Sequence, residues 1–307
     1  MTPAGRVQDE VVQILGERAR PDMPIGPLTT YRVGGSATVG FEPESDDDLR
    51  RVGDAVRASG LPVLVVGKGS NLLVADAGFP GLAVVRGEAF ATVTIDDRTV
   101  RAGGAAALPV VARQTAAAGL RGFEWAVGVP GSMGGAVRMN AGGHGSDMAE
   151  TLVRVRLVDL RSDHDEVVPA ADLDLGYRHS TVTADQVVVW AEVELAVGDA
   201  AAAEAEIRDI VRWRRANQPG GQNAGSVFTN PPDDSAGRLI EAAGCKGLRE
   251  GSAEVSPKHA NFFQTDDGGS ADDVFRLMTE VRRRVRESQG VDLVPETRLI
   301  GFEQGGQ

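Results

Sequence analysis

A cluster of glycines between residues 128 and 145 limits the structures that this chain can adopt. The segment reads GVPGSMGGAVRMNAGGHG and holds seven glycines in 18 residues, whereas the chain has 39 in 307. We expect neither an ordinary helix nor an ordinary strand here, because glycine loses the most conformational freedom on folding. Glycine-rich backbone lets amide groups approach a ligand closely and point at anionic oxygens. The segment therefore predicts a phosphate-binding loop, and a glycine-rich loop that serves packing alone is the alternative.

A second glycine turn, GKGSN at residues 67–71, follows the apolar run at residues 61–66. Up to Leu72 it matches only part of the dinucleotide fingerprint, because the third glycine and the later acidic residue are absent. Ser70 and Asn71 would add side-chain donors to the amides of a phosphate nest. A tight turn between strands is the alternative. Two amide-rich loops in one chain suggest a cofactor that carries phosphate.

Composition and charge exclude several classes of function. The formal net charge of −12 argues against bulk binding to nucleic acid or to an acidic membrane. The single cysteine, Cys245, excludes an intrachain disulfide and a cysteine-based metal cluster. The four histidines show no paired spacing, so we expect no metal site. The start of the chain lacks a signal-like apolar core, and no apolar run approaches about 18 residues. We expect a cytoplasmic protein.

Hydrophobic periodicity and capping residues predict an α+β fold. Helices are expected over residues 44–60, 108–118, 200–216 and 236–243, and a long one is expected from Ser270 to Gly290. Strands are expected over residues 61–66, 82–86, 91–95, 99–102, 151–160, 187–197, 260–265 and 298–302. Helices and strands do not alternate regularly, which disfavours a Rossmann-type fold. The helix over residues 200–216 is interpreted as a linker into a new unit.

Three short polar segments are further candidates for a site: GYRHS at residues 176–180, NAGSVFTNP at 223–231 and PETR at 295–298. Each alone has an ordinary structural interpretation. Ser226 does not lie in a G-x-S-x-G elbow, which argues against a serine hydrolase.

Seven segments in this order resemble UDP-N-acetylenolpyruvoylglucosamine reductases, also called UDP-N-acetylmuramate dehydrogenases. These are flavin reductases of bacterial peptidoglycan precursor synthesis. The segments are TYRVGG (30–35), GKGSNLL (67–73), GVPGSMGGAVRMNA (128–141), GYRHS (176–180), NAGS (223–226), PKHAN (257–261) and PETRLIG (295–301). The resemblance covers about residues 29–302. It is to the shorter class of the family, which lacks a tyrosine-bearing substrate loop.

The resemblance implies an FAD-binding module of the vanillyl-alcohol-oxidase (PCMH) type over residues 1–200, in subdomains of about 1–66 and 67–200. An α+β domain for the UDP-sugar would occupy residues 201–307. FAD would be bound non-covalently, with NADPH as co-substrate, and we expect a monomer without nucleic-acid or membrane partners. The implied FAD contacts are Tyr31, Gly67, Gly69, Ser70, Asn71, Leu72, Val129, Pro130, Gly131, Ser132, Gly134, Gly135 and Asn140.

The resemblance also implies the chemistry. NADPH would reduce FAD, and hydride would pass from flavin N5 to C3 of the enolpyruvyl ether of UDP-N-acetylglucosamine. Ser226 would give the proton to C2, which completes UDP-N-acetylmuramate. Arg178 and Glu296 would hold the carboxylate and stabilise the enol-like intermediate, with Glu296 kept protonated by a desolvated site. The implied substrate contacts are Tyr177, Asn230 and Lys258.

One position departs from the family pattern, and three other interpretations stay open. Thr229 stands where the family commonly has a lysine or arginine, and Lys246, Lys258 or Arg238 are the candidates to replace that cation. A related flavin oxidase would commonly attach FAD through a histidine or cysteine, for which His144 is the remaining candidate. A non-catalytic paralogue would have no need to keep Ser226, Arg178 and Glu296 together. A paralogue that reduces another enolpyruvyl nucleotide is suggested only by Thr229.

Overall fold

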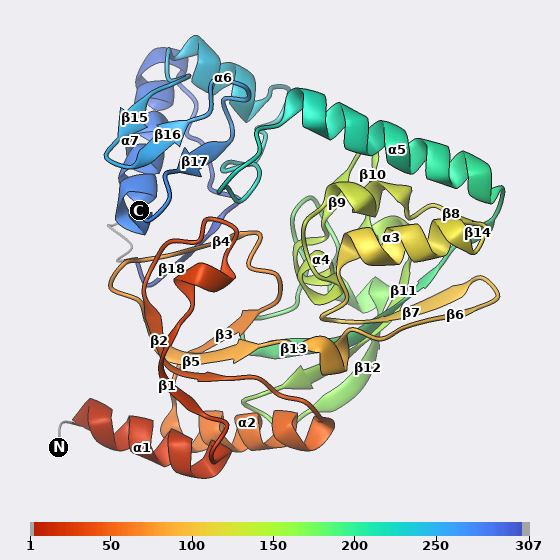
Figure 1. Ribbon diagram of the computed structural model, residues 1–307, viewed down its shortest axis with the longest axis vertical. Coiled ribbons are helices and arrows are strands. Elements are labelled where there is room, and N and C mark those ends of the chain that lie inside the picture. The colour runs from red at the N-terminus through yellow and green to blue at the C-terminus, as the bar shows by residue number, and fades with distance from the viewer. Residues whose placement is uncertain (1–2, 303–307) are drawn as a thin grey trace. The chain divides into compact units, whose positions relative to one another are not determined.

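The computed structural model describes residues 3–302 (Figure 1). Its contacts group the described chain into two units. The first unit contains the residues up to Met23, Thr38–Lys68 and Pro80–Trp213, and the second contains Pro24–Ala37, Gly69–Phe79 and the residues from Arg214 onward. This grouping reflects contacts in space, and the domain boundaries expected from the sequence near residues 66 and 200 stay predictions.

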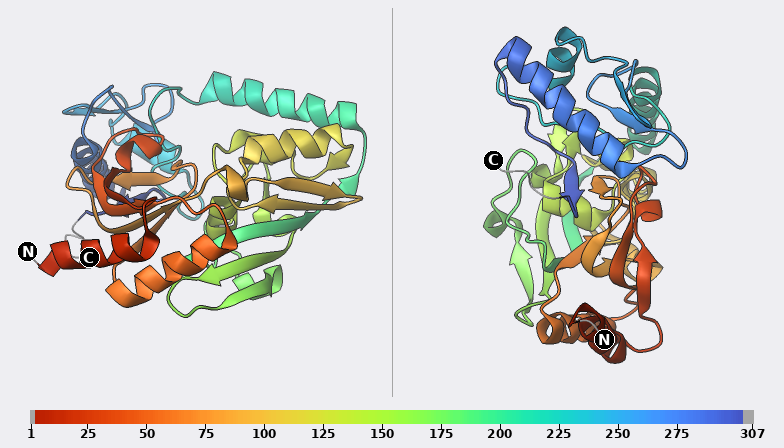
Figure 2. Two further views of the ribbon diagram at one scale, coloured as in Figure 1. Left: turned by 60° about the horizontal axis from the view of Figure 1, so that its bottom comes forward. Right: turned by 90° about the vertical axis from the view of Figure 1, so that its left-hand side faces the viewer.

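One layer of the first unit is a four-stranded sheet with two helices against it. The strand order is β1 (Arg20–Pro24), β2 (Ser36–Phe41), β5 (Phe79–Val85) and β3 (Val63–Val66), and β3 and β5 run parallel. The helices α1 (Pro3–Leu15) and α2 (Asp46–Ser59) lie side by side in both views (Figures 1 and 2). Ser45 caps α2 by accepting a hydrogen bond from Asp48 N, and Gly60 ends it at φ 67°. The helix expected over residues 44–60 is thus confirmed.

The second layer of this unit is an antiparallel five-stranded sheet. Its order is β12 (Asp165–Pro169), β11 (Leu152–Asp159), β13 (Gln186–Glu194), β7 (Thr99–Gly103) and β6 (Val93–Asp96). Helices α3 (Leu108–Ala117) and α5 (Ala200–Asn217) confirm two further expectations and lie alongside each other in both views (Figures 1 and 2). Two short pairs complete the unit: β8 (Leu120–Arg121) with β14 (Ala196–Val197), and β9 (Gly142–Gly143) with β10 (Ser146–Asp147).

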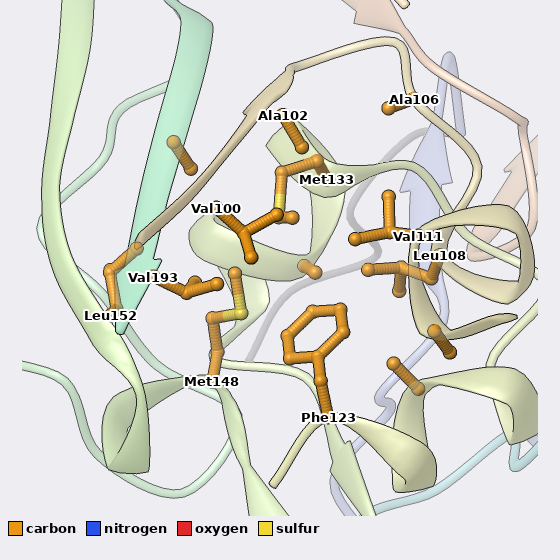
Figure 3. Packing of buried hydrophobic residues seen from close by; sticks show 14 of the residues in the cluster. Val100, Ala102, Ala106, Leu108, Val111, Phe123, Met133, Met148, Leu152 and Val193 are labelled. Atoms are coloured by element: carbon orange, nitrogen blue, oxygen red, sulfur yellow. The ribbon is translucent and has the colours of Figure 1, made fainter. Parts of the chain in front are cut away.

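The glycine cluster contains a helix, which corrects the expectation from composition. The helix α4 (Met133–Met139) packs against β13, and its cap is the Ser132 hydroxyl, which accepts a hydrogen bond from Gly135 N. Its apolar residues Met133, Ala136 and Val137 are buried in the core that Figure 3 shows around Phe123. Each glycine inside a helix costs about 1 kcal/mol relative to alanine. Tertiary burial offsets that cost here, so the glycine count alone was misleading.

The second unit combines short strands with two helices. The strands β4 (Leu72–Val74) and β18 (Arg298–Ile300) pair in parallel. The strands β15 (Arg249–Glu250), β16 (Ala253–Val255) and β17 (Phe263–Thr265) form an antiparallel sheet against α7 (Ala271–Gln289), and α6 (Ala236–Ala242) also contacts α7 (Figure 2). The 3₁₀ segments within the described residues are Gly26–Leu28, Glu88–Phe90, Glu124–Gly128, Met148–Glu150 and Ala170–Leu173. No helix in residues 3–302 combines the length and the apolar character needed to cross a membrane.

The start of α7 is tied to the neighbouring sheet by Asp273. The carboxylate accepts hydrogen bonds from Ser252 N and Ser252 Oγ, both at 2.7 Å, and pairs with Arg276. Gly251 lies so close that a Cβ there would be 2.3 Å from the carboxylate. The hydrogen bonds from the Ser252 backbone and hydroxyl hold the pKa of Asp273 below its ordinary value.

We expect Asp273→Asn to destabilise the protein at pH 7 by about 1–2 kcal/mol, because a charge-assisted hydrogen bond becomes a neutral one. The folded pKa of Asp273 lies below the unfolded value of about 3.9, so its stabilisation is present above that value. It is lost as the pH falls through the folded pKa. Urea unfolding from pH 7 to pH 3 should therefore show the variant and the parent converging in acid. Glu287→Gln, which breaks an exposed pair on α7, is the control with little effect. An equal difference at every pH would contradict the assignment.

Candidate functional site

The two glycine segments of the sequence meet in the first unit. A Cβ at Gly67 would lie 2.3 Å from Ser132 Oγ, so only glycine permits this approach. Ser132 is 3 % exposed, and its hydroxyl accepts a hydrogen bond from Gly135 N at 3.4 Å. The structure therefore brings together three residues that were predicted as cofactor contacts, from segments more than 60 positions apart in the sequence.

A small cavity of about 50 Å³ opens at this meeting point. It has room for a few water-sized groups. Valine side chains form part of its wall, and its polar lining includes Gly67, Ser132, Gly134, Gly135, Arg86 and Arg138. The absent Cβ atoms and the arginines fit a phosphate-bearing cofactor, because exposed backbone amides and cations both favour anionic oxygens.

Arg86 is a residue of this cavity that the sequence interpretation missed. It directly follows β5 and is 6 % exposed. Its Nη1 donates to Val188 O, whereas Nε and Nη2 have no hydrogen-bond partner among the described residues. Burial lowers the pKa of Arg86 to about 10. The only sequence signal was a cation at the end of the apolar run 82–86, which is also common at ordinary strand ends.

Arg178 lies in a tight turn of the first unit. Gly176 and His179 exchange backbone hydrogen bonds of 3.1 Å, which leaves Tyr177 and Arg178 as the turn residues. Arg178 has φ 56°, in the left-handed region where a residue other than glycine is strained by about 1–3 kcal/mol. Its Nη2 donates to Gly142 O at 3.1 Å, and its guanidinium carbon is 5.1 Å from the centre of the Tyr177 ring. Strain of this kind is typical of functional positions.

The side chain of Asn140 holds the turn at residues 176–179 through a hydrogen bond to its backbone. The residue is 2 % exposed, and its Nδ2 donates to Gly176 O at 2.9 Å and to Asp147 Oδ2 at 3.2 Å. Its Oδ1 accepts a hydrogen bond from Ala149 N at 2.9 Å. The side chain thus bonds to protein groups through both polar atoms. Its role as an FAD contact stays a prediction, and its observed bonds connect α4 to the turn that carries Arg178.

Ser226 and Glu296 lie on neighbouring segments of the second unit. Ser226 forms an isolated antiparallel bridge with Phe262, and Glu296 N donates to Val227 O at 2.8 Å. Both side chains are half-buried. The structure therefore brings these two predicted catalytic residues onto adjacent backbone within one unit, although 70 positions separate them.

Asn261 fixes the segment that carries Ser226. The side chain is buried, its Oδ1 accepts from Phe228 N at 3.0 Å, and its Nδ2 donates to Phe228 O at 2.8 Å. Asn261 O also accepts a hydrogen bond from Val227 N at 2.9 Å. Asn261 ends the PKHAN motif, so a signal was present, but the motif did not indicate a positioning role.

Part of the 67–72 segment belongs to this second unit. Asn71 Nδ2 donates to Glu296 O at 3.1 Å, and Asn71 O accepts from Arg298 N at 3.0 Å. Gly69 has φ 60°, and a Cβ there would lie 2.2 Å from Leu28 O. A predicted cofactor contact, Asn71, is thus bonded directly to the backbone of a predicted catalytic residue.

The other predicted cofactor contacts have more ordinary surroundings. Tyr31 is fully buried, and burial raises the pKa of its hydroxyl. Ser70 is half-buried, and Leu72 begins β4. In the glycine cluster, Val129 N donates to Ala126 O, Pro130 is exposed, and the carbonyl of buried Gly131 accepts from Leu108 N.

The predicted substrate contacts are exposed, and two of them bond to protein groups. Tyr177 is 61 % exposed. Asn230 Oδ1 accepts from Ala236 N at 3.0 Å, and Lys258 Nζ donates to Arg215 O at 2.6 Å. Their roles toward a substrate stay predictions.

The candidates to replace the missing cation at Thr229 all bond to protein groups, and their role toward a substrate stays a prediction. Thr229 Oγ1 donates to Val294 O at 3.3 Å. Besides Lys258, the candidates were Lys246, which pairs with Glu241, and Arg238, which pairs with Asp234. Within residues 3–302, no cluster of three or more His, Cys, Asp or Glu side chains could hold a metal ion.

Comparison with known proteins identifies the family. A family model described as the C-terminal domain of UDP-N-acetylenolpyruvoylglucosamine reductase matches residues 217–300, and one described as an FAD-binding domain matches residues 37–163. The reductase of Heliobacterium modesticaldum is 43 % identical over 289 residues, covering 92 % of this chain and 91 % of that protein. The reductase of Rubrobacter xylanophilus is 40 % identical over 297 residues, covering 96 % and 99 %.

A solved structure supports the same assignment. The crystal structure of the UDP-N-acetylenolpyruvylglucosamine reductase from Thermus caldophilus superposes with a TM-score of 0.79 at 33 % identity, covering 91 % of this chain and 97 % of that chain. The α+β fold with an FAD-binding module and a C-terminal α+β domain is therefore confirmed. An oxidoreductase with an FAD-binding domain, this chain belongs to the UDP-N-acetylenolpyruvoylglucosamine reductase family.

Proposed function

We propose that this protein uses NADPH to reduce the enolpyruvyl ether of UDP-N-acetylglucosamine to UDP-N-acetylmuramate. The observation that carries the proposal is the presence of Ser226, Glu296 and Arg178 on a chain of which 92–96 % matches members of the reductase family. FAD, held by the FAD-binding module, supplies the hydride chemistry when it is bound. A cytoplasmic location and a monomeric state remain predictions.

Ser226 is proposed as the proton donor to C2 of the substrate. An alcohol is a weak acid, but the enolate-like carbon that develops during reduction is a strong base, so the transfer is favourable. The hydroxyl needs a fixed position, because proton transfer requires hydrogen-bond distance in the reacting complex. Asn261 and the bridge to Phe262 hold the backbone on both sides of Ser226 and so provide that position.

Arg178 and Glu296 are proposed to bind the substrate carboxylate and the charge that develops beside it. A guanidinium suits the carboxylate because its planar fork can donate two parallel hydrogen bonds. The strained turn at φ 56° sets the direction in which the Arg178 side chain leaves the backbone. The bond from Glu296 N to Val227 O keeps Glu296 beside the Ser226 segment.

A visible spectrum of the purified protein tests the proposed function. We expect flavin absorbance that bleaches when NADPH is added without oxygen and returns when UDP-N-acetylglucosamine enolpyruvate follows. Return with oxygen but not with the enolpyruvyl substrate would favour an oxidase or a paralogue with another substrate. A protein that cannot take up FAD would refute the proposal altogether.

Ser226→Ala should separate the two half-reactions, because it removes the proposed acid and leaves the flavin site intact. Stopped-flow absorbance should show flavin reduction by NADPH within about twofold of the parent rate. Flavin reoxidation by the enolpyruvyl substrate should slow by about 10²–10⁴-fold. Ser288→Ala, which removes an exposed hydroxyl on α7, is the matched control and should change neither rate. Reoxidation at the parent rate would exclude Ser226 as the donor.

Asn140→Ala should impair substrate binding through Arg178, because it deletes the bond that holds Gly176. We expect KM for the enolpyruvyl substrate to rise by about 10-fold, consistent with roughly 1.5 kcal/mol for a buried hydrogen bond. The same change in an Arg178→Ala background should add little, because the two residues act as one unit. Additive losses would indicate a general structural role instead. A loss of FAD affinity in titrations would favour the predicted cofactor contact.

A further inference from the structure

Arg86 is a buried cation that the proposed chemistry does not use. It leaves the end of β5 and reaches the cavity beside Gly67 and Ser132 in the first unit. Two of its three guanidinium nitrogens, Nε and Nη2, have no hydrogen-bond partner within the described part of the chain. Buried polar groups are normally paired, so two orphan donors on one cation require an explanation.

The surrounding backbone is shaped to admit this side chain. A Cβ at Gly104 would lie 2.0 Å from Arg86 Nη2, and a Cβ at Gly134 would lie 3.1 Å from Nη1. The bond from Nη1 to Val188 O and the Phe90 ring, 5.8 Å from the guanidinium carbon, fix its orientation. The guanidinium is thus held in place before any ligand arrives.

Stability alone does not explain the arrangement. Burial lowers the pKa of Arg86 to about 10, and no carboxylate among residues 3–302 offsets this effect, so the group is a desolvated cation at neutral pH. A buried charge without a partner destabilises a protein, and an apolar residue of similar volume would be at least as stable. The presence of an arginine here therefore points to an anionic ligand.

The orphan nitrogens form the edge that binds oxyanions elsewhere in this chain. Arg156 donates from Nε and Nη2 to the two oxygens of Asp165 at 2.8 and 2.6 Å. Arg282 does the same with Asp292 at 2.6 and 2.8 Å. In Arg86, by contrast, this edge is unpaired among the described residues, and the residue lines a cavity with glycines and Ser132, where backbone amides also favour negative charge.

We propose that the guanidinium of Arg86, which lines this cavity, anchors the cofactor by donating hydrogen bonds to the diphosphate of FAD. The inference rests on the FAD-dependent function proposed above and adds a residue that the family motifs do not include. The ligand replaces the missing counter-charge, so binding converts a destabilising group into a paired one. A cavity of about 50 Å³ admits a phosphate group rather than an isoalloxazine ring.

Calorimetric titrations of cofactor-free protein test this role. The probes are FAD, ADP, adenosine and riboflavin, and the variants are Arg86→Met and Arg86→Lys. Arg86→Met should lower the affinity for FAD and for ADP by about 10- to 100-fold, which is the range expected for the loss of a charge-assisted hydrogen bond. Adenosine and riboflavin, which lack the diphosphate, should bind as they do to the parent. Arg86→Lys keeps the positive charge but lacks the planar guanidinium, so its affinity for ADP should lie between those of the parent and of Arg86→Met. Arg113→Met, on the exposed face of α3, is the matched control.

Thermal unfolding of the same cofactor-free proteins separates binding from structure. We expect the Tm of Arg86→Met to equal or exceed that of the parent, because an unpaired buried charge is removed. Its Tm should then gain less from added FAD. Parent-like affinity for ADP, or a lower Tm without cofactor together with equal losses for all four probes, would overturn the role of Arg86. A parent protein that binds neither FAD nor ADP would instead refute the proposed function, and this inference with it.

Discussion

The contact between Gly67 and Ser132 is the constraint on which the first unit of the site depends. A Cβ at residue 67 would lie 2.3 Å from the Ser132 hydroxyl, so the bare backbone that follows β3 can approach the side chain that caps α4. The missing side chains of Gly104 and Gly134 likewise leave space for the Arg86 guanidinium. Absent side chains thereby place amides and a cation around one small cavity. Glycine serves here as space for close approach, rather than as a source of flexibility.

The second unit positions its functional residues by a different device. Backbone-to-backbone bonds join three segments that are distant in sequence, at residues 226–228, 261–263 and 295–297. Buried Asn261 completes the connection by mimicking a peptide group toward Phe228. Ser226 and Glu296 are consequently carried by irregular segments with few alternative positions. This arrangement suits the roles proposed for Ser226 and Glu296, because pre-organised groups need no reorganisation during a reaction.

Local signals predicted much of the fold. The cap at Ser45, the stop at Gly60 and the apolar stripe that ends at Gly290 marked helices that the structure contains, because capping and periodicity depend on neighbours in sequence. The helix α4 was missed because its stability comes from burial of Met133 and Val137 in a core built by distant strands. Composition cannot report such tertiary compensation.

In the candidate site, too, local sequence signals predicted some features, and others depend on the tertiary structure. Motifs supplied the candidate residues, and the structure added how they are held: Asn140 under the Arg178 turn, Asn261 beside Ser226, and Asn71 against Glu296. Arg86 could not be predicted, since a single cation after an apolar run has no distinctive spacing. Its burial and its two nitrogens without a partner among the described residues depend on the tertiary structure, which a local sequence pattern does not encode.

The central claim is that the protein adds two hydrogen atoms across the enolpyruvyl double bond. Mass spectrometry of the UDP-sugar after incubation with FAD-loaded protein and NADPH, without oxygen, tests it most directly. The account predicts a product heavier than the substrate by two hydrogen atoms, formed in a one-to-one ratio with oxidised NADPH. A UDP-sugar of unchanged mass, from protein whose flavin NADPH readily reduces, would contradict it.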